Sequence, residues 1–154
     1  MTPFERITTQ VQAQIPLVRA MEAALGRERA HALVRAALDK ANRELVAQRG
    51  ALLDIETLAT EFAGFGAGIR YEFETLEQTA SLLRNQVNHC DYAEFMEQIG
   101  ARDLGELLIC NSDFAMADQL GLRLERSKTC MNGDGQCDFC YRLKSDRPGD
   151  ATAG

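Results

Sequence analysis

Long apolar runs are missing from this sequence. No stretch approaches the ~18–20 apolar residues that a membrane span needs, so we expect none. Lys/Arg-rich runs are also missing and the net charge is −6, which disfavours nucleic acid and anionic membranes as partners. The N-terminus lacks a basic segment followed by an apolar core, the pattern of a secretory signal. We therefore expect a cytoplasmic protein.

Histidine is scarce, and the cysteines are odd in number. The two histidines, His31 and His89, are too few for a His-rich metal site. All five cysteines lie in the C-terminal half of the chain: Cys90, Cys110, Cys130, Cys137 and Cys140. A reducing compartment argues against a disulfide framework. Clustered thiols in such a compartment instead favour metal binding or catalysis.

The N-terminal part of the chain has the pattern of helices. Apolar residues recur at steps of three and four over residues 4–46, which predicts two amphipathic helices, the second over about 26–46. Pro16 predicts a break or kink near residues 14–15. Asp54 or Thr57 is placed to cap a further helix over about 55–65.

The C-terminal part alternates strands with helices. Apolar and polar residues alternate over 69–75, and 79–89 favours a second strand. Asp91 is predicted to cap a short helix, and Asp103 one over about 104–120 that ends at Gly121. Two extended runs, residues 122–131 and 136–144, surround a turn sequence typical of a hairpin.

These elements predict an α+β fold, with N-terminal helices packed on an antiparallel sheet and helices inserted between the sheet hairpins. The length and the 45% hydrophobic content suit one domain, which we place at residues 1–144. Residues 145–154 have the composition of a disordered tail.

The last hairpin predicts which side chains face the interior. A two-residue turn at residues 133–134 places Cys130 opposite Cys137 and Arg126 opposite Tyr141. This face is mainly apolar and should pack on the helices, so Arg126 would point inward. A buried guanidinium needs a partner, either Asp113 or a substrate carboxylate. The alternative is an arginine at the rim whose stem covers apolar surface.

A thiol and a carboxylate lie together in the run from Cys110 to Asp118. On a helix, Cys110 and Asp113 share one face, either as part of an active site or as a lightly polar spot in a core. The carboxylate would raise the pKa of the thiol, so a nucleophilic Cys110 would need a nearby positive charge, from Arg126 or from a cationic substrate.

The spacing of Cys137 and Cys140 is that of a zinc or redox motif. On a strand these two thiols point to opposite faces, and no second closely spaced Cys/His pair completes a four-ligand site. A looser metal site could be formed by Cys90, Cys110, Cys137 and Asp113. Buried cysteines that act as small hydrophobic residues are the alternative for each of these thiols.

Four segments, taken in order, resemble the motif set of the L-2-amino-thiazoline-4-carboxylic acid hydrolase family. They are CDYAEF at 90–95, CNSDF at 110–114, LERSKT at 124–129 and GDGQCDF at 133–139. The matching positions are Cys90, Cys110, Asp113, Arg126, Thr129, Cys137 and Asp138. Cys130 and Cys140 lie outside the family's pattern.

The resemblance implies a ring-opening hydrolase that acts on carbon–nitrogen bonds of cyclic amidines. In the named reaction, water adds to the C=N carbon of a thiazoline that bears a carboxylate, giving N-carbamoyl-cysteine. Cys110 would be the nucleophile, or a ligand in a metal–water variant, and Asp113 would move protons or hold the ring nitrogen.

The resemblance also implies roles for the other matching residues. Cys90 and Cys137 would complete the catalytic set, while Arg126, Thr129 and Asp138 would bind the substrate. No cofactor is firmly predicted, and zinc or another transition metal is left open. The expected partner is a small molecule with a carboxylate, and a homo-oligomer is left open.

A non-catalytic sensor domain is the competing interpretation. The layout of N-terminal helices followed by a cysteine-bearing hairpin also resembles the four-vinyl-reductase type of small-molecule-binding domain. The same cysteine-lined pocket would then bind a small molecule or a metal without turnover.

Overall fold

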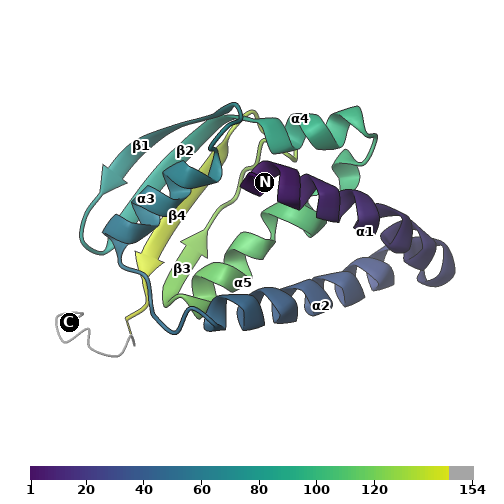
Figure 1. Ribbon diagram of the computed structural model, residues 1–154, viewed down its shortest axis with the longest axis horizontal. Helices are drawn as coiled ribbons and strands as arrows, with labels where there is room; N and C mark the ends of the chain where they lie inside the picture. The colour runs from purple at the N-terminus through teal and green to yellow at the C-terminus, as the bar shows by residue number, and fades with distance from the viewer. Residues whose placement is uncertain (146–154) are drawn as a thin grey trace.

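A computed structural model describes residues 1–145 and confirms the α+β fold (Figure 1). Three N-terminal helices precede a β-hairpin, a group of shorter helices and a second pair of strands. The elements are α1 Pro3–Leu25, α2 Arg27–Ala47, α3 Ile55–Phe65, β1 Tyr71–Gln78, β2 Leu82–Cys90, α4 Asp91–Gln98, the 3-10 helix η1 Arg102–Leu104, the π-helix η2 Glu106–Cys110, α5 Ser112–Gln119, β3 Leu122–Glu125 and β4 Cys137–Leu143.

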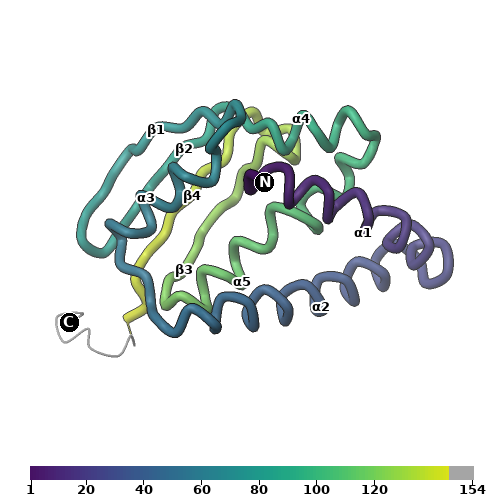
Figure 2. Tube along the Cα trace, viewed as in Figure 1, coloured from purple at the N-terminus to yellow at the C-terminus, as the bar shows by residue number. Residues whose placement is uncertain are grey.

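The four strands form one antiparallel sheet in the order β1-β2-β4-β3. Figure 1 shows α3 lying across one face of this sheet and α5 alongside β3. Helices α1 and α2 run side by side in opposite directions and join at the end far from the sheet (Figure 2). Helix α2 packs on both α1 and α5. The core therefore lies between one face of the sheet and the helices.

Pro16 does not break the first helix, so of the predicted break or kink the break was wrong. Helix α1 continues through Pro16 to Leu25 and ends where Gly26 takes a φ of 83°. A proline inside a helix removes one backbone hydrogen bond, a local loss. Val11 and Val18, on either side of the proline, are both buried in the core and hold the two halves in one helix.

Of the three predicted aspartate caps, only Asp54 is confirmed. Its Oδ1 accepts the Thr57 N–H at 2.7 Å at the start of α3. Asp91 is instead the first residue of α4, and its Oδ2 accepts the backbone N–H of Arg70 at 2.7 Å. Asp103 receives hydrogen bonds of 2.7 and 2.8 Å from the guanidinium of Arg19. Both side chains thus join distant segments rather than capping their own helices.

The register of the last hairpin differs from the prediction by two residues. Strand β3 ends before Arg126, residues 126–136 form the connection, and Leu124 pairs with Tyr141. A shift of two residues keeps each side chain on its predicted face, whereas a shift of one would reverse it. Arg126 therefore still points inward. Lys128, which a strand continuing to residue 131 would place on the same face as Arg126, is exposed because the strand has already ended.

No helix among residues 1–145 is long and apolar enough to cross a membrane. The predicted tail lies outside the described residues apart from Ser145. The single-domain boundary, the absence of a nucleic-acid partner and a homo-oligomer stay predictions.

Candidate active site

Arg126 is a buried cation that joins two segments of the site. Its side chain is only 3% exposed. Nη1 donates to Asp113 Oδ2 at 2.8 Å, and Nη2 donates to the carbonyl oxygen of Cys110 at 3.0 Å. The guanidinium carbon lies 4.9 Å from the ring centre of Phe114 and 5.0 Å from that of Phe139. Of the two partners predicted for this arginine, the structure shows Asp113.

Asp113 has one oxygen engaged and one free. Oδ2 accepts from Arg126, while no group among residues 1–145 donates to Oδ1. The side chain is 33% exposed and lines a cavity of about 150 Å³. Burial among apolar walls raises the pKa of Asp113, and Arg126 opposes this effect. The free oxygen is therefore a hydrogen-bond acceptor, and a potential base, at the wall of a small cavity.

Aromatic side chains form much of the rest of this cavity. They come from α3 and from strands β1 and β4: Phe62, Phe65, Tyr71, Phe139 and Tyr141. The Phe62 and Phe139 ring centres lie 5.0 Å apart in an edge-to-face contact. Burial raises the pKa of Tyr71 and of Tyr141, so both phenols stay protonated and can donate. Neither hydroxyl hydrogen-bonds to another described residue.

Cys110 is the last residue of a π-helix. The single helix predicted over 104–120 is in fact three pieces, η1, η2 and α5, with Cys110 at the junction before α5. Short π-helical turns are frequent at functional sites. Burial raises the pKa of the Cys110 thiol well above its usual value; Arg126 lowers it and Asp113 raises it. The resting side chain is therefore a neutral thiol that needs a base to become a nucleophile.

Two of the other cysteines interact electrostatically with Cys110 from separate strands. Cys137 is buried on β4, and its Sγ accepts the Cys130 N–H at 3.2 Å. The pKa of Cys137 is lowered, because Cys130 hydrogen-bonds to it. Cys90 ends β2, and burial raises its pKa to about 11. Cys140 lies on the opposite face of β4 from Cys137, as predicted for residues three apart on a strand.

Comparison with known families assigns the chain to one of them. The model of the L-2-amino-thiazoline-4-carboxylic acid hydrolase family matches residues 5–141. The chain belongs to this family. The match confirms the resemblance inferred from four short segments, and it extends over the N-terminal helices as well. A search of curated proteins finds no match.

In this family member, Thr129 and Asp138 organise the connection between β3 and β4. Asp138 Oδ1 accepts the backbone N–H groups of Ser127 and Lys128 at 2.8 and 2.7 Å. The Thr129 hydroxyl donates to Glu106 Oε1 at 2.7 Å, which links the connection to η2. Of all the predicted site residues, Asp113 alone is among those that line the aromatic cavity. The predicted role of Thr129 and Asp138 as substrate ligands stays a prediction.

The four residues of the predicted loose metal site are not gathered as closely as ligands. Among residues 1–145, no three of Cys90, Cys110, Cys137 and Asp113 bring ligand atoms within 4.8 Å of one another. The group that does so is His89, Asp91 and Glu94. The sequence analysis missed this group and the aromatic cavity. The spacing of a histidine and an aspartate two residues apart, with a glutamate three further on, was the only signal for the former.

Proposed function

We propose that this chain opens a small cyclic amidine or thiazoline-like ring that bears a carboxylate, using Cys110 and Asp113. The observation that carries the proposal is that Asp113, whose Oδ1 accepts no hydrogen bond from residues 1–145, lines the aromatic cavity. Membership of a family named for a hydrolase of 2-amino-thiazoline-4-carboxylic acid supports this substrate class.

The cavity suits a flat ring with amidine nitrogens. An apolar cavity of about 150 Å³ is large enough for one benzene-sized ring. Amidine N–H groups pair well with a carboxylate, and a cationic amidinium is attracted to the faces of aromatic rings. Asp113 would hold the ring nitrogen, while Tyr71 and Tyr141 would supply neutral donors. A small ligand of another charge would leave the Asp113 oxygen without a partner.

Cys110 and Asp113 would divide the chemistry between nucleophile and base. The neutral Cys110 thiol attacks the C=N carbon while Asp113 accepts its proton, and the tetrahedral adduct then breaks the bond from that carbon to a ring heteroatom, which takes the proton back from Asp113. Water next attacks the same carbon and expels the Cys110 thiol, which releases the opened product. A carboxylate with a raised pKa is a stronger base than a free one, which suits this role. Arg126 would act as a positioning residue, because both its hydrogen-bonding nitrogens already hold Asp113 and the Cys110 carbonyl.

Turnover of a ring panel tests the proposal. The purified chain is incubated with cyclic amidines, thiazolines including 2-amino-thiazoline-4-carboxylate, and lactams, and ring opening is followed by mass spectrometry. We expect turnover of the amidine-type rings, and loss of at least about 100-fold in Cys110→Ala and Asp113→Asn. Cys140→Ala is the matched cysteine control, since Cys140 lies on the opposite face of β4 from buried Cys137. Asp118→Asn is the matched carboxylate control on the same helix, and both should keep full activity.

Each result bears on a separate part of the proposal. Intact-protein mass should show a substrate adduct in the wild type and none in Cys110→Ala. Full turnover in Cys110→Ala would show that Cys110 is not the nucleophile. Saturable binding of a ring without any turnover would favour the sensor interpretation instead.

A further inference from the structure

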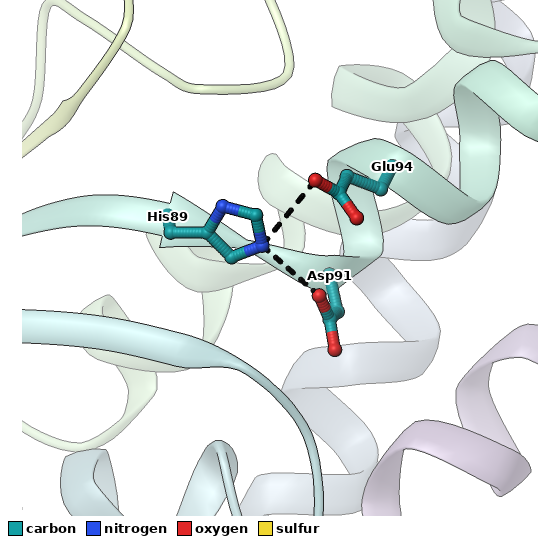
Figure 3. A group of neighbouring side chains, drawn as sticks. All are labelled: His89, Asp91 and Glu94. Carbon is teal, nitrogen blue, oxygen red and sulfur yellow. Dashed lines mark hydrogen bonds and ion pairs between the residues drawn. The ribbon is translucent and has the colours of Figure 1, made fainter.

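We propose that His89, Asp91 and Glu94 form a binding site for one divalent first-row transition-metal ion. The site lies where β2 passes into α4, and it does not depend on the hydrolase assignment. His89 comes from the strand and both carboxylates from the first turn of the helix (Figure 3). In Figure 3 the imidazole points between the two carboxylates.

The distances between the three side chains fit a shared cation. His89 Nε2 lies 3.1 Å from Asp91 Oδ1 and 3.4 Å from Glu94 Oε1. A metal with bonds of about 2.0–2.2 Å separates neighbouring ligand atoms by roughly 3.0–3.5 Å in octahedral or tetrahedral geometry. A single Nε2–H can align with only one of these carboxylates, so the observed arrangement suits a metal better than a hydrogen-bonded pair.

The backbone places the ligands without moving the helix. Val87 pairs with Phe73 but His89 pairs with Glu72, so Asn88 is an extra residue in β2. Such a β-bulge re-aims the side chains that follow it. It turns His89 to the same side as exposed Glu72 and away from the core face that carries Val87. Asp91 and Glu94 are three residues apart on α4 and therefore share one helix face.

Asp91 is held for this role by an outer contact. Its Oδ2 accepts the backbone N–H of Arg70 at 2.7 Å, which orients the carboxylate and leaves Oδ1 directed at His89. Metal-binding carboxylates are typically fixed by such second hydrogen bonds. The Asp91 and His89 side chains are 27% and 15% exposed, and Glu94 is 56% exposed. Ligand positions on the open side would be filled by water.

The site borders a cavity that an ion could reach. His89 and Glu94 line a cavity of about 430 Å³ between α4 and the connection between β3 and β4, together with Cys90 and Arg102. One imidazole nitrogen and two carboxylate oxygens favour Zn²⁺, Fe²⁺, Co²⁺ or Mn²⁺ over the soft ions that thiolates select. Co²⁺ is the probe, because coordination by a cysteine thiolate would add an intense near-ultraviolet charge-transfer band.

Titration of the metal-free full-length chain with Co²⁺, followed by calorimetry and absorbance, tests the site. We expect one equivalent to bind without a thiolate band. Loss of a directly bound ligand in His89→Gln or Glu94→Gln should weaken binding by at least about tenfold, since even outer contacts are worth 10–100-fold. The matched controls are His31→Gln, the only other histidine, and Glu97→Gln, one turn further along α4. Both should bind within about twofold of the wild type.

The same experiment can overturn the proposal in three ways. Absence of saturable binding, binding that persists in both His89→Gln and Glu94→Gln, or a thiolate band that saturates with one equivalent would each refute this site. Circular dichroism of every variant shows that the fold is kept. Glu94 is half-exposed, so its variant reports on binding even where His89→Gln perturbs the bulge.

Discussion

Replacing Arg126 with methionine removes the cation that holds the candidate site together. Methionine keeps the apolar stem between Phe114 and Phe139 but leaves the Asp113 carboxylate and the Cys110 carbonyl without their donor. Breaking one side of a buried ion pair costs about 3–5 kcal/mol. Asp113 is 33% exposed, so water can replace part of the lost interaction. We therefore expect a loss of about 2–4 kcal/mol in the free energy of unfolding.

A double-mutant cycle separates this pairing from lost packing. Asp113→Asn alone should cost about 1–3 kcal/mol, because Arg126 stays buried without its counter-charge. Adding Asp113→Asn to Arg126→Met should cost less than the sum by about 1–3 kcal/mol, since the second change removes the unpaired carboxylate. Urea unfolding followed by circular dichroism at neutral pH gives all four values. A loss below about 1 kcal/mol in Arg126→Met, or effects that add within about 0.5 kcal/mol, would refute the assignment of Arg126 as the organising residue.

The other predictions concern glycine positions and pH. A Cβ on Gly66 would lie 2.5 Å from the Cβ of Tyr71, so Gly66→Ala should cost about 1–3 kcal/mol in thermal unfolding. Gly64→Ala is the matched control inside α3, because a Cβ there meets nothing within 4 Å. It should raise the free energy of unfolding by about 0.5–1 kcal/mol. A stability change of the same sign in both variants would contradict the close contact between Gly66 and Tyr71. Arg19 lowers the pKa of Asp103 to about 2, below the unfolded value of about 4. The contribution of this exposed pair to the free energy of unfolding should be present above pH ~4 and lost towards pH ~2. Asp103→Asn should therefore lower the free energy of unfolding by up to about 1 kcal/mol at pH 7 and leave it unchanged near pH 2.

Elements set by local contacts were predictable from the sequence. The helix periodicity of residues 4–46 and the Asp54 cap depend on residues within a few positions of one another. Gly121 takes a φ of 78° directly after α5 and the Leu120 turn, the conformation that glycine was predicted to supply there. In each case the interaction partner lies within one helical turn, so no knowledge of the rest of the fold was needed.

Predictions failed where a distant partner competes for a local group. Asp91 and Asp103 have the sequence context of caps, yet Arg70 and Arg19 take their carboxylates. The turn sequence of the last hairpin correctly predicted a turn, but the predicted length of the strand before it was wrong. Asp138 binds the backbone of residues 127–128 and so pulls these residues out of the ladder. The local sequence pattern cannot rank a helix cap against a hydrogen-bond donor from a distant segment.

The pairing of Arg126 with Asp113 could be predicted because it depends on which face of the strand Arg126 occupies, and not on the exact register of the hairpin. The two-residue error in the hairpin left Arg126 on the inner face, where the only alternatives were a carboxylate of the protein or of a substrate. The aromatic cavity could not be predicted from the sequence. Its residues Phe62, Tyr71 and Tyr141 have the pattern of ordinary core positions, and they come together only when the sheet packs on α3.

The bulge at Asn88 determines which face of the sheet His89 and Cys90 each take. In a regular strand, His89 would share the face of buried Val87, and Cys90 would point the other way. The extra residue reverses both, so that Cys90 pairs with Tyr71 and His89 pairs with Glu72. Deleting Asn88 would remove the bulge but keep both side chains on these faces, because His89 would then follow Val87 directly and still pair with Glu72. Co²⁺ binding should therefore survive the deletion as well as Asn88→Ala, and its loss in the deletion variant alone would show that the bulge geometry itself, rather than the facing of His89, positions the ligands.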